Sequence, residues 1–203
     1  MPTPEKIDLY RRHKDEYASP KKPVLVRVKP AQYLSIIGQG APGDDRFSAC
    51  IGALYAVAFT IKMTRKFAGQ QDYAVCKLEG QWFFEGDPSN TPREQWRWKL
   101  LIRTPDFIRG PDRQQAIDAL LKKGKPREVN EVDLEKIDEG QCVQMLHVGP
   151  YDREKESLAE MRAMAEQRGL RFAGPHHEIY LSDPRRVPAE RLKTILRQPV
   201  VRS

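Results

Sequence analysis

The chain has 203 residues, of which 39% are hydrophobic and 31% charged, and its formal net charge is +7. This length allows one sizeable core or two small ones that share an interface. The most apolar run, Cys50 to Ile61, is too short to span a bilayer and is closed by Lys62, and residues 1–23 are charged and contain no apolar secretory segment. We therefore expect a cytoplasmic protein that is not inserted in a membrane.

The charges and the cysteines exclude further classes of protein. A positive net charge permits nucleic acid as a partner, but the basic residues are dispersed and interleaved with acidic ones, so we expect no direct nucleic-acid binding. Cys50, Cys76 and Cys142 are widely spaced and form no C-x-x-C pair, which argues against a disulfide framework and against a structural zinc site. Each lies in an apolar run and is expected to be buried.

The first half of the chain predicts strands on either side of a long helix. A charged arm over residues 1–23 precedes the first strand, and Pro30 marks a bend between the first two strands. Asp44 and Asp45 are suitable caps for the helix, whose apolar residues recur at spacings of three and four. We expect strands at residues 24–28, 33–38, 73–79 and 96–104, and the helix at residues 47–67.

The second half predicts a similar series of elements. Asp112 is a suitable cap for a short helix that ends at Gly124, and the polar residues 124–139 are expected to link the two halves. Asp152, which follows the turn Gly149-Pro150-Tyr151, is a suitable cap for another helix. We expect helices at residues 112–123 and 152–168, and strands at residues 140–148, 176–182 and 192–196.

The two halves therefore repeat one order of elements, which is strand, helix, strand, strand. We predict an α+β fold in which two β-α-β-β repeats are related by a pseudo-twofold axis, with the helices on the outer sheet faces and a ligand cleft at the centre. The domain is expected to span residues 24–200, with repeat one at about 24–123 and repeat two at about 140–200.

Alternation in the predicted strand at 176–182 separates a core face from a polar face. Ile179 lies on one face, whereas Glu178 and Tyr180 lie on the other. A carboxylate beside a phenol on a rigid strand suits the binding of a cationic or planar guest, or the transfer of a proton. The residues that we expect on the cleft side of the first repeat are Lys77 and Glu79.

Aromatic side chains are candidates for the walls of this cleft. Residues 80–88 form a loop or strand end with three consecutive aromatics, of which Trp82 is the candidate, and Trp98 is a second candidate. Tyr55 and Phe59 lie at the edge of the apolar stripe of the long helix. An aromatic residue there more often fills the core than contacts a ligand, and we keep both as candidates.

No pattern for a metal, a cofactor or a covalent nucleophile is found in the sequence. His176 and His177 are neighbours on a strand and point to opposite faces, so both cannot bind one ion without a bulge, and no H-E-x-x-H pattern is present. The glycine pattern at residues 38–43 contains Pro42 and lacks the β-α-β context of a dinucleotide site. No Ser or Cys elbow is present, and we expect neither a metal nor a cofactor.

Four stretches of this sequence resemble one known family. They are V-G-P-Y-D at 148–152, H-H-E-I-Y-L-S-D-P at 176–184, L-E-G-Q-W-F-F at 78–84 and W-R-W-K-L-L-I-R-T-P-D-F-I at 96–108. Together they resemble the stand-alone branch of the GyrI-like small-molecule-binding family, whose fold is a tandem β-α-β-β pair called SHS2. The resemblance covers about residues 24–200.

This resemblance implies a pocket and a range of functions. The family includes the drug-sensing halves of multidrug transcription regulators, gyrase-inhibitory proteins, and stand-alone members that hydrolyse cyclopropane-bearing, DNA-alkylating natural products. It implies that Glu178 lies at the centre of the pocket and that Trp82 and Tyr151 are aromatic walls. The regulators carry a helix-turn-helix module, for which residues 1–23 are too few, so a direct role as a transcription factor is not expected.

Two functions agree with these residues. In the first, the protein is a detoxifying hydrolase. Glu178 activates a water, and a tyrosine, either Tyr151 or Tyr55, donates to the carbonyl oxygen of a strained cyclopropane conjugated to a dienone. In the second, it is a non-catalytic module that binds or senses drugs. A protein partner such as gyrase is less favoured because no acidic, DNA-mimicking surface is evident at a net charge of +7. We expect an aromatic small-molecule ligand and a monomer or weak dimer.

Overall fold

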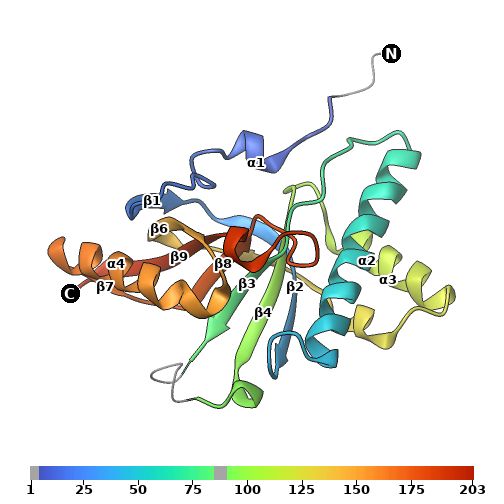
Figure 1. Ribbon diagram of the computed structural model, residues 1–203. Coiled ribbons are helices and arrows are strands. Elements are labelled where there is room, and N and C mark those ends of the chain that lie inside the picture. Colours follow the sequence, from blue (N-terminus) through green and yellow to red (C-terminus); the bar gives the residue numbers. More distant parts are fainter. Residues whose placement is uncertain (1–4, 85–90) are drawn as a thin grey trace. The chain divides into compact units, whose positions relative to one another are not determined.

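The computed structural model describes residues 5–84 and 91–203, which form two compact units (Figure 1). Of the described residues, the first unit holds 5–13, 31–78, 83–84 and 91–137, and the second holds 14–30, 79–82 and 138–203. Helices and antiparallel strands occur in both units, which confirms the α+β fold class. The units interleave along the sequence, and the symmetry between contiguous repeats stays a prediction.

The first unit is built around a three-stranded antiparallel sheet. Strand β2 (Ala31–Gln39) lies between β4 (Arg97–Thr104) and β5 (Asp133–Ile137). The helices of this unit are α1 (Leu9–Arg12), α2 (Asp45–Phe67) and α3 (Gly110–Lys122), with short 3-10 helices at Arg93–Gln95 and Arg127–Glu131.

Helix α2 is the core helix of the first unit. Asp44 caps it, since its Oδ1 accepts a hydrogen bond from the Phe47 amide at 2.6 Å. Its length and composition alone would suit a membrane span. However, Leu54, Val57 and Ile61 are almost fully buried within the folded unit, and the helix packs against α3 and β2. Burial of this apolar stripe explains the hydropathy of the helix without a membrane.

The second unit is built around a five-stranded antiparallel sheet in the order β1-β6-β9-β8-β3. The bounds are Val24–Val28 for β1, Glu79–Phe83 for β3, Gly140–Val148 for β6, His176–Tyr180 for β8 and Lys193–Arg202 for β9. The short β7 (Leu170–Phe172) pairs with the end of β9. Two 3-10 helices lie at Tyr151–Arg153 and at Ala189–Arg191.

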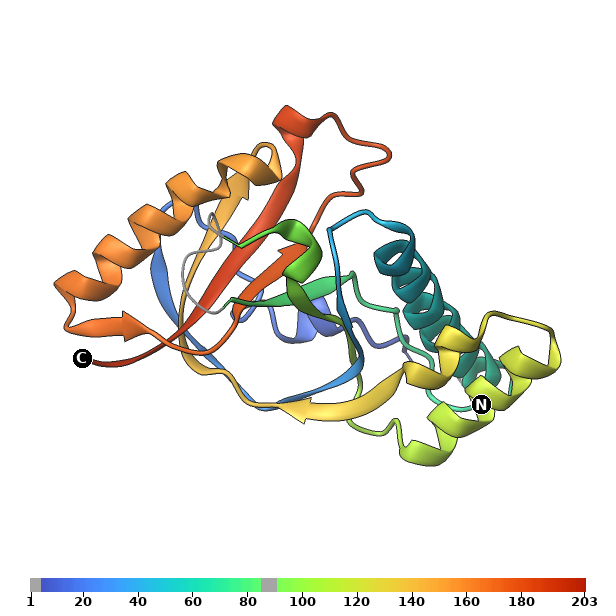
Figure 2. The same cartoon turned by 90° about the horizontal axis from the view of Figure 1, so that it is seen from below.

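Helix α4 (Glu154–Gln167) covers one face of this second sheet, as Figures 1 and 2 show. Its Met161 and Ala165 pack with residues of β6 and β9, among them Met145 and Leu196. Leu196 pairs with Met145 on one side and with Glu178 on the other, so these three residues point to the same face. Glu178 therefore lies on the face that α4 covers.

Several sequence-based element limits need correction. Residues 73–78 are irregular apart from one bridge at Tyr73, so the predicted strand at 73–79 is wrong and β3 begins only at Glu79. The expected linker 124–139 contains β5, which completes the first sheet. Helix α3 begins before Asp112, whose side chain instead accepts a hydrogen bond from the Arg109 amide at 2.8 Å. The predicted aromatic loop at 80–88 falls partly outside the described residues.

A buried network of charges occupies the face of the second sheet opposite α4. Arg197 Nη1 contacts Glu139 Oε2 at 2.8 Å, and the other oxygen of Glu139 lies 2.8 Å from His177 Nδ1. His177 Nε2 lies 3.0 Å from Glu79 Oε2, and the Tyr17 hydroxyl donates to Glu79 Oε1 at 3.2 Å. Arg197, His177 and Glu79 are 0% exposed. Charges so deeply buried are tolerated only when each has partners.

The same network holds the segment that precedes β1. Arg197 Nη2 donates to the Glu16 carbonyl at 2.6 Å, and Gln144 Nε2 donates to the carbonyls of Glu16 and Ala18 at 3.1 and 2.6 Å. Arg197 Nε also donates to Gln144 Oε1 at 2.7 Å. Residues 16–18 of the predicted arm are thus bound to the sheet through their backbone.

The network sets the protonation of its members. Burial alone would lower the pKa of His177, but Glu139 and Glu79 outweigh it and raise this pKa from 6.5 to about 9. Burial would raise the pKa of Glu139, but His177 and Arg197 lower it from 4.5 to about 2. The protein therefore holds His177 as a cation and Glu139 as an anion at neutral pH.

We expect the free energy of unfolding to fall as the pH rises from 6.5 to 9. The raised pKa of His177 gives stability that is complete below pH 6.5 and is lost as the pH rises through about 9, by up to about 3 kcal/mol. Urea unfolding at each pH measures this slope, and the His177→Gln variant, which lacks the titrating group, should show a shallower slope. Equal slopes in the two proteins would contradict the assignment.

Candidate functional site

Two carboxyl groups meet under the first turn of α4. Glu178 projects from β8 and Glu154 is the first residue of α4, and their side chains share a hydrogen bond. Both residues are at most 9% exposed. Burial, followed by the charge of Glu178, raises the pKa of Glu154 well above its usual 4.5. Glu154 therefore keeps its proton at neutral pH and donates it to the Glu178 carboxylate.

Glu178 also accepts a hydrogen bond from the neighbouring Tyr180. The pKa of Tyr180 is raised well above 10 by burial and by the Glu178 charge, so the phenol stays protonated and donates. The nearby indole of Trp82 acts on this pKa in the opposite direction. Both groups lie over Gly80, because a Cβ placed on Gly80 would be 2.9 Å from the Tyr180 hydroxyl and 3.5 Å from Trp82 Nε1. The missing side chain of Gly80 thus makes room for the pair.

Tyr151 and His176 stand at the margin of the carboxyl pair. Tyr151 is 40% exposed, and its ring meets that of Tyr180 edge to face, with the centroids 6.0 Å apart. Burial of its hydroxyl, with the nearby charge of Glu178, raises the pKa of Tyr151 to about 12. His176 Nε2 lies 3.5 Å from Glu178 Oε1.

The same place is where the described residues could hold a cation. Ligand atoms of Glu154, His176 and Glu178 all lie within 4.8 Å of one another. One imidazole nitrogen and two carboxylate oxygens suit a divalent transition metal. A cation and the proton that joins the two carboxyl groups would exclude each other, because both occupy the same gap.

This arrangement allows two kinds of chemistry. A carboxylate at the foot of a partly exposed aromatic wall can attract a cationic or electron-poor planar molecule. It can also take a proton from a water, while a neighbouring phenol donates a hydrogen bond to an oxygen that gains charge.

The structure brings together four of the residues that the sequence singled out. Glu178, Tyr180, Trp82 and Tyr151 lie in the second unit and on or beside the face that α4 covers. Glu79 also belongs to this unit, but it is the register partner of Ile179 and points to the opposite face, where it contacts His177. Its predicted place beside Glu178 is wrong, because the register pairs Glu79 with Ile179 and so puts the two carboxyl groups on opposite faces.

The remaining four candidates lie in the first unit. Trp98 is fully buried, with its ring edge-on to Phe47 at 5.1 Å and its Nε1 donating to the Gly40 carbonyl at 3.3 Å. Phe59 is 51% exposed and stacks on Tyr55 at 6.0 Å. The fourth, Lys77, is exposed and lies in the irregular stretch before β3. Trp98 thus acts as a core residue within its unit.

Sequence reasoning missed Glu154, although a signal was present. The predicted buried stripe of this helix was Leu158, Met161 and Ala165, and Glu154 extends that stripe backward by one turn, at i−4 from Leu158. A carboxyl group on the buried stripe of a helix is rare unless it is paired. Its position thus indicated a partner on the sheet.

Comparison with known proteins agrees with this geometry. A model of the GyrI-like small molecule binding domain matches residues 21–201. The chain is similar to two solved structures from Listeria innocua, an uncharacterized conserved protein (39% identity, TM-score 0.91) and a hydrolase encoded by lin2189 (37% identity, TM-score 0.90). Both alignments cover 97% of this chain and 100% of the other chain.

A more distant similarity concerns the fold alone. The C-terminal domain of EcmrR is 12% identical to this chain, with a TM-score of 0.57, over 90% of this chain and 98% of that domain. A search of the curated proteins gave no significant match.

We expect the Gly80→Ala variant to disrupt the site while the protein still folds. The new methyl group would stand 2.9 Å from the Tyr180 hydroxyl, so this oxygen must move away from Glu178. A crystal structure of the variant would reveal the displacement. Gly52→Ala is the matched control, because a Cβ there has no atom within 4 Å and alanine favours the helix. An unmoved Tyr180 in Gly80→Ala would contradict the packing described above.

Proposed function

The chain belongs to the GyrI-like small molecule binding domain family, and on this basis we propose that its Glu178 site binds aromatic, electrophilic molecules and hydrolyses cyclopropane-bearing genotoxins. The observation that carries the proposal is the buried carboxyl pair, in which burial and the charge of Glu178 favour the protonated form of Glu154. The similarity to the hydrolase encoded by lin2189 supports catalysis over simple binding.

The groups around Glu178 favour a particular class of ligand. Tyr151 and Tyr180 offer ring faces and edges, and Trp82 adds an indole on the same side of the sheet. Planar, electron-poor or cationic molecules gain both stacking and attraction to the carboxylate in such a setting. A dienone conjugated to a strained cyclopropane is electron-poor and planar, so it fits this description.

The proposed reaction adds one water across one carbon–carbon bond. Glu178 accepts a proton from the water as its oxygen attacks the exposed cyclopropane carbon and the ring bond breaks. The electron pair of that bond moves into the dienone, which becomes a phenolate, and its oxygen takes a hydrogen bond and then a proton from a tyrosine. The proton held by Glu178 afterwards returns to that tyrosine through solvent, so the product is the substrate plus one water.

Tyr151 is the better of the two tyrosines for the donor role. Its hydroxyl is protonated at neutral pH because its pKa is about 12, and its residue is 40% exposed, so an entering ligand can reach it. The Tyr180 hydroxyl is buried against Glu178. Tyr55, the other candidate from the sequence, belongs to the first unit.

A non-catalytic binding module is the second candidate function. Glu178 is enclosed by Glu154 and Tyr180, which are favoured in their protonated forms and can donate to its carboxylate. A carboxylate stabilised in this way suits an anchor for a cationic drug. Under either function we expect a cytoplasmic monomer or weak dimer that acts on small molecules, without direct contacts to nucleic acid or membrane.

We expect wild-type protein to convert a duocarmycin-type cyclopropane into a product heavier by one water. Mass spectrometry of the small molecule measures this conversion. Glu178→Gln should slow this conversion by at least about 100-fold, because the amide cannot accept the proton. Glu166→Gln is the matched control, since it removes one exposed carboxylate of α4 and should leave the rate unchanged. Full turnover in Glu178→Gln would rule out its role as the base.

The two glutamates should respond differently to the same substitution. Glu154→Gln keeps a neutral group that donates to Glu178, so we expect its rate to fall by less than about 10-fold. A loss as large as that of Glu178→Gln would mean that Glu154 acts as an anion. Addition of a chelator should leave the wild-type rate unchanged if a proton, and no cation, joins the pair.

Unchanged ligand mass, with saturable quenching of tryptophan fluorescence, would select the binding module instead. Glu178→Gln should then weaken the binding of a cationic aromatic probe such as tetraphenylphosphonium, and Glu166→Gln should not. This binding measurement shows whether Glu178 acts as an anchor for the ligand, whereas the turnover measurement shows whether it acts as a catalytic base.

A further inference from the structure

We propose that His147 and Ser157 are positioning residues that hold Glu154 and Tyr151 in register with Glu178. The inference rests on the proposed function of this site and assigns a role to two side chains outside it. They form a buried clamp between β6 and α4, which we call the His147–Ser157 clamp. His147 is 5% and Ser157 8% exposed.

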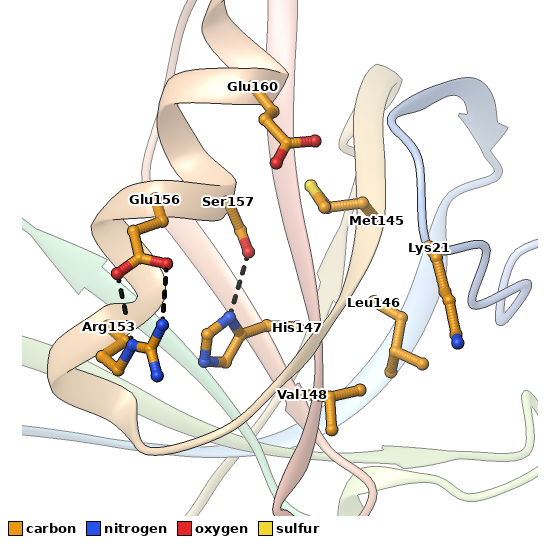
Figure 3. A pocket seen from close by; sticks show the side chains of 9 residues that line it. All are labelled: Lys21, Met145, Leu146, His147, Val148, Arg153, Glu156, Ser157 and Glu160. Carbon is orange, nitrogen blue, oxygen red and sulfur yellow. Dashed lines mark hydrogen bonds and ion pairs between the residues drawn. The ribbon is translucent and has the colours of Figure 1, made fainter. Parts of the chain in front are cut away.

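The clamp joins three segments of the second unit (Figure 3). His147 comes from the end of β6, and its Nδ1 lies 3.0 Å from Ser157 Oγ on α4. Its other ring nitrogen, Nε2, lies 3.2 Å from the carbonyl oxygen of Pro150, in the turn that connects the strand to the helix. One imidazole therefore fixes a strand end, a turn and the first turns of a helix.

The partners of His147 determine the direction of both hydrogen bonds. A carbonyl oxygen only accepts, so Nε2 must carry the hydrogen that goes to Pro150. In the neutral imidazole, Nδ1 is then the acceptor and the Ser157 hydroxyl donates to it. Both ring nitrogens are satisfied by this single tautomer, which gives the clamp a defined geometry.

The segments that the clamp fixes are the ones that carry site residues. Tyr151 directly follows Pro150, and Glu154 begins α4 one turn before Ser157. Residues three apart on a helix are neighbours on its surface, so Glu154 cannot shift relative to the sheet unless Ser157 shifts as well. The clamp is a second attachment of these turns of α4 to a side chain of the sheet, beside the contact of Glu154 with Glu178.

Strand register places the clamp and the site on the same face. His147 pairs with Thr194 of β9, which pairs with Tyr180 of β8, so the three residues form one row across the sheet. The first turns of α4 therefore lie between two fixed supports, the clamp on β6 and the carboxyl pair on β8. A catalytic pair requires positioning within about half an ångström, which a single carboxyl–carboxyl hydrogen bond cannot provide alone.

Water can reach the clamp from the protein surface. His147 and Ser157 border a cavity of about 370 Å³, whose other lining residues are Lys21, Met145, Leu146, Val148, Arg153, Glu156 and Glu160. In Figure 3 the bonded pair of Arg153 and Glu156 lies on the helix beside the His147 ring. Removal of the Ser157 hydroxyl would let water take its place and loosen α4 at this point.

The test compares Ser157→Ala with wild type by NMR titration of ¹³C-labelled glutamate carboxyl carbons. Glu154 faces Glu178, His176 and Tyr180 on β8 and Tyr151 in the preceding turn, and closeness to Glu178 helps to raise its pKa. We expect a lower Glu154 pKa in Ser157→Ala, because the two carboxyl groups separate and water enters. Turnover should fall by about 10- to 100-fold in kcat with little change in KM.

Gln198→Met is the matched control for a merely structural effect. Gln198 is also 5% exposed and lies in the same sheet, where its Nε2 donates to the carbonyls of Ala173 and Gly174 at 2.9 and 3.3 Å. This variant should lower Tm as much as Ser157→Ala does, yet leave the Glu154 titration and kcat unchanged. If Ser157→Ala lowers Tm but titrates like wild type, the proposal is overturned.

Two substitutions of His147 keep the proposal testable if Ser157→Ala does not fold. Glutamine places its amide near Nε2 and can still donate to Pro150, whereas asparagine places its amide oxygen near Nδ1 and can still accept from Ser157. We expect His147→Asn to keep the wild-type Glu154 titration and His147→Gln to lose it, and the reverse would overturn the proposal. Because the titration needs no substrate, absence of turnover in wild type would defeat the proposed function alone.

Discussion

The second unit depends on a fully buried ion network that lies behind the candidate site. On the face of the sheet opposite α4, Glu139 binds both Arg197 and His177. His177 is the residue before Glu178 on β8. Removal of any one partner would leave an uncompensated charge in the core, so the network tolerates few alternative arrangements. It therefore fixes the position and direction of β8 within the sheet, and hence the face from which Glu178 projects.

Because side chains alternate along β8, the charged groups on its two faces have different roles. Of the residues that point away from α4, His177 is ionised, paired and enclosed, and Ile179 is fully buried, which suits a scaffold. Residues that point toward α4 include Glu178, whose neighbours Glu154 and Tyr180 are favoured in their neutral forms. A carboxylate held by neutral donors keeps its charge available for a ligand, whereas one paired with arginine would not. The two faces are chemically different although they belong to the same five-residue strand.

Local pattern and family resemblance predicted the α+β class, the family and most strands, because their periodicity is strong and their turns carry Gly, Pro or Asp. The side-chain partners of Glu178 were less predictable. Alternation identifies which residues share a face of one strand, but not which strand or helix covers that face. Glu79 was assigned to the wrong face because alternation within its own strand does not reveal that it pairs with Ile179 and not with Glu178. Glu154 was missed because a carboxyl group in the first turn of a helix ordinarily indicates favourable helix-dipole electrostatics.

The segment before β1 illustrates how an attachment can leave little trace in a sequence. Arg197 and Gln144 bind the carbonyl oxygens of Glu16 and Ala18, and every residue type carries such an oxygen. Evolution can therefore replace the side chains at these two positions without breaking the attachment, provided that the sheet retains its arginine and glutamine. Among homologues, we expect positions 16 and 18 to vary in sequence while this segment keeps its path, so that structural superposition would align them where sequence alignment would not.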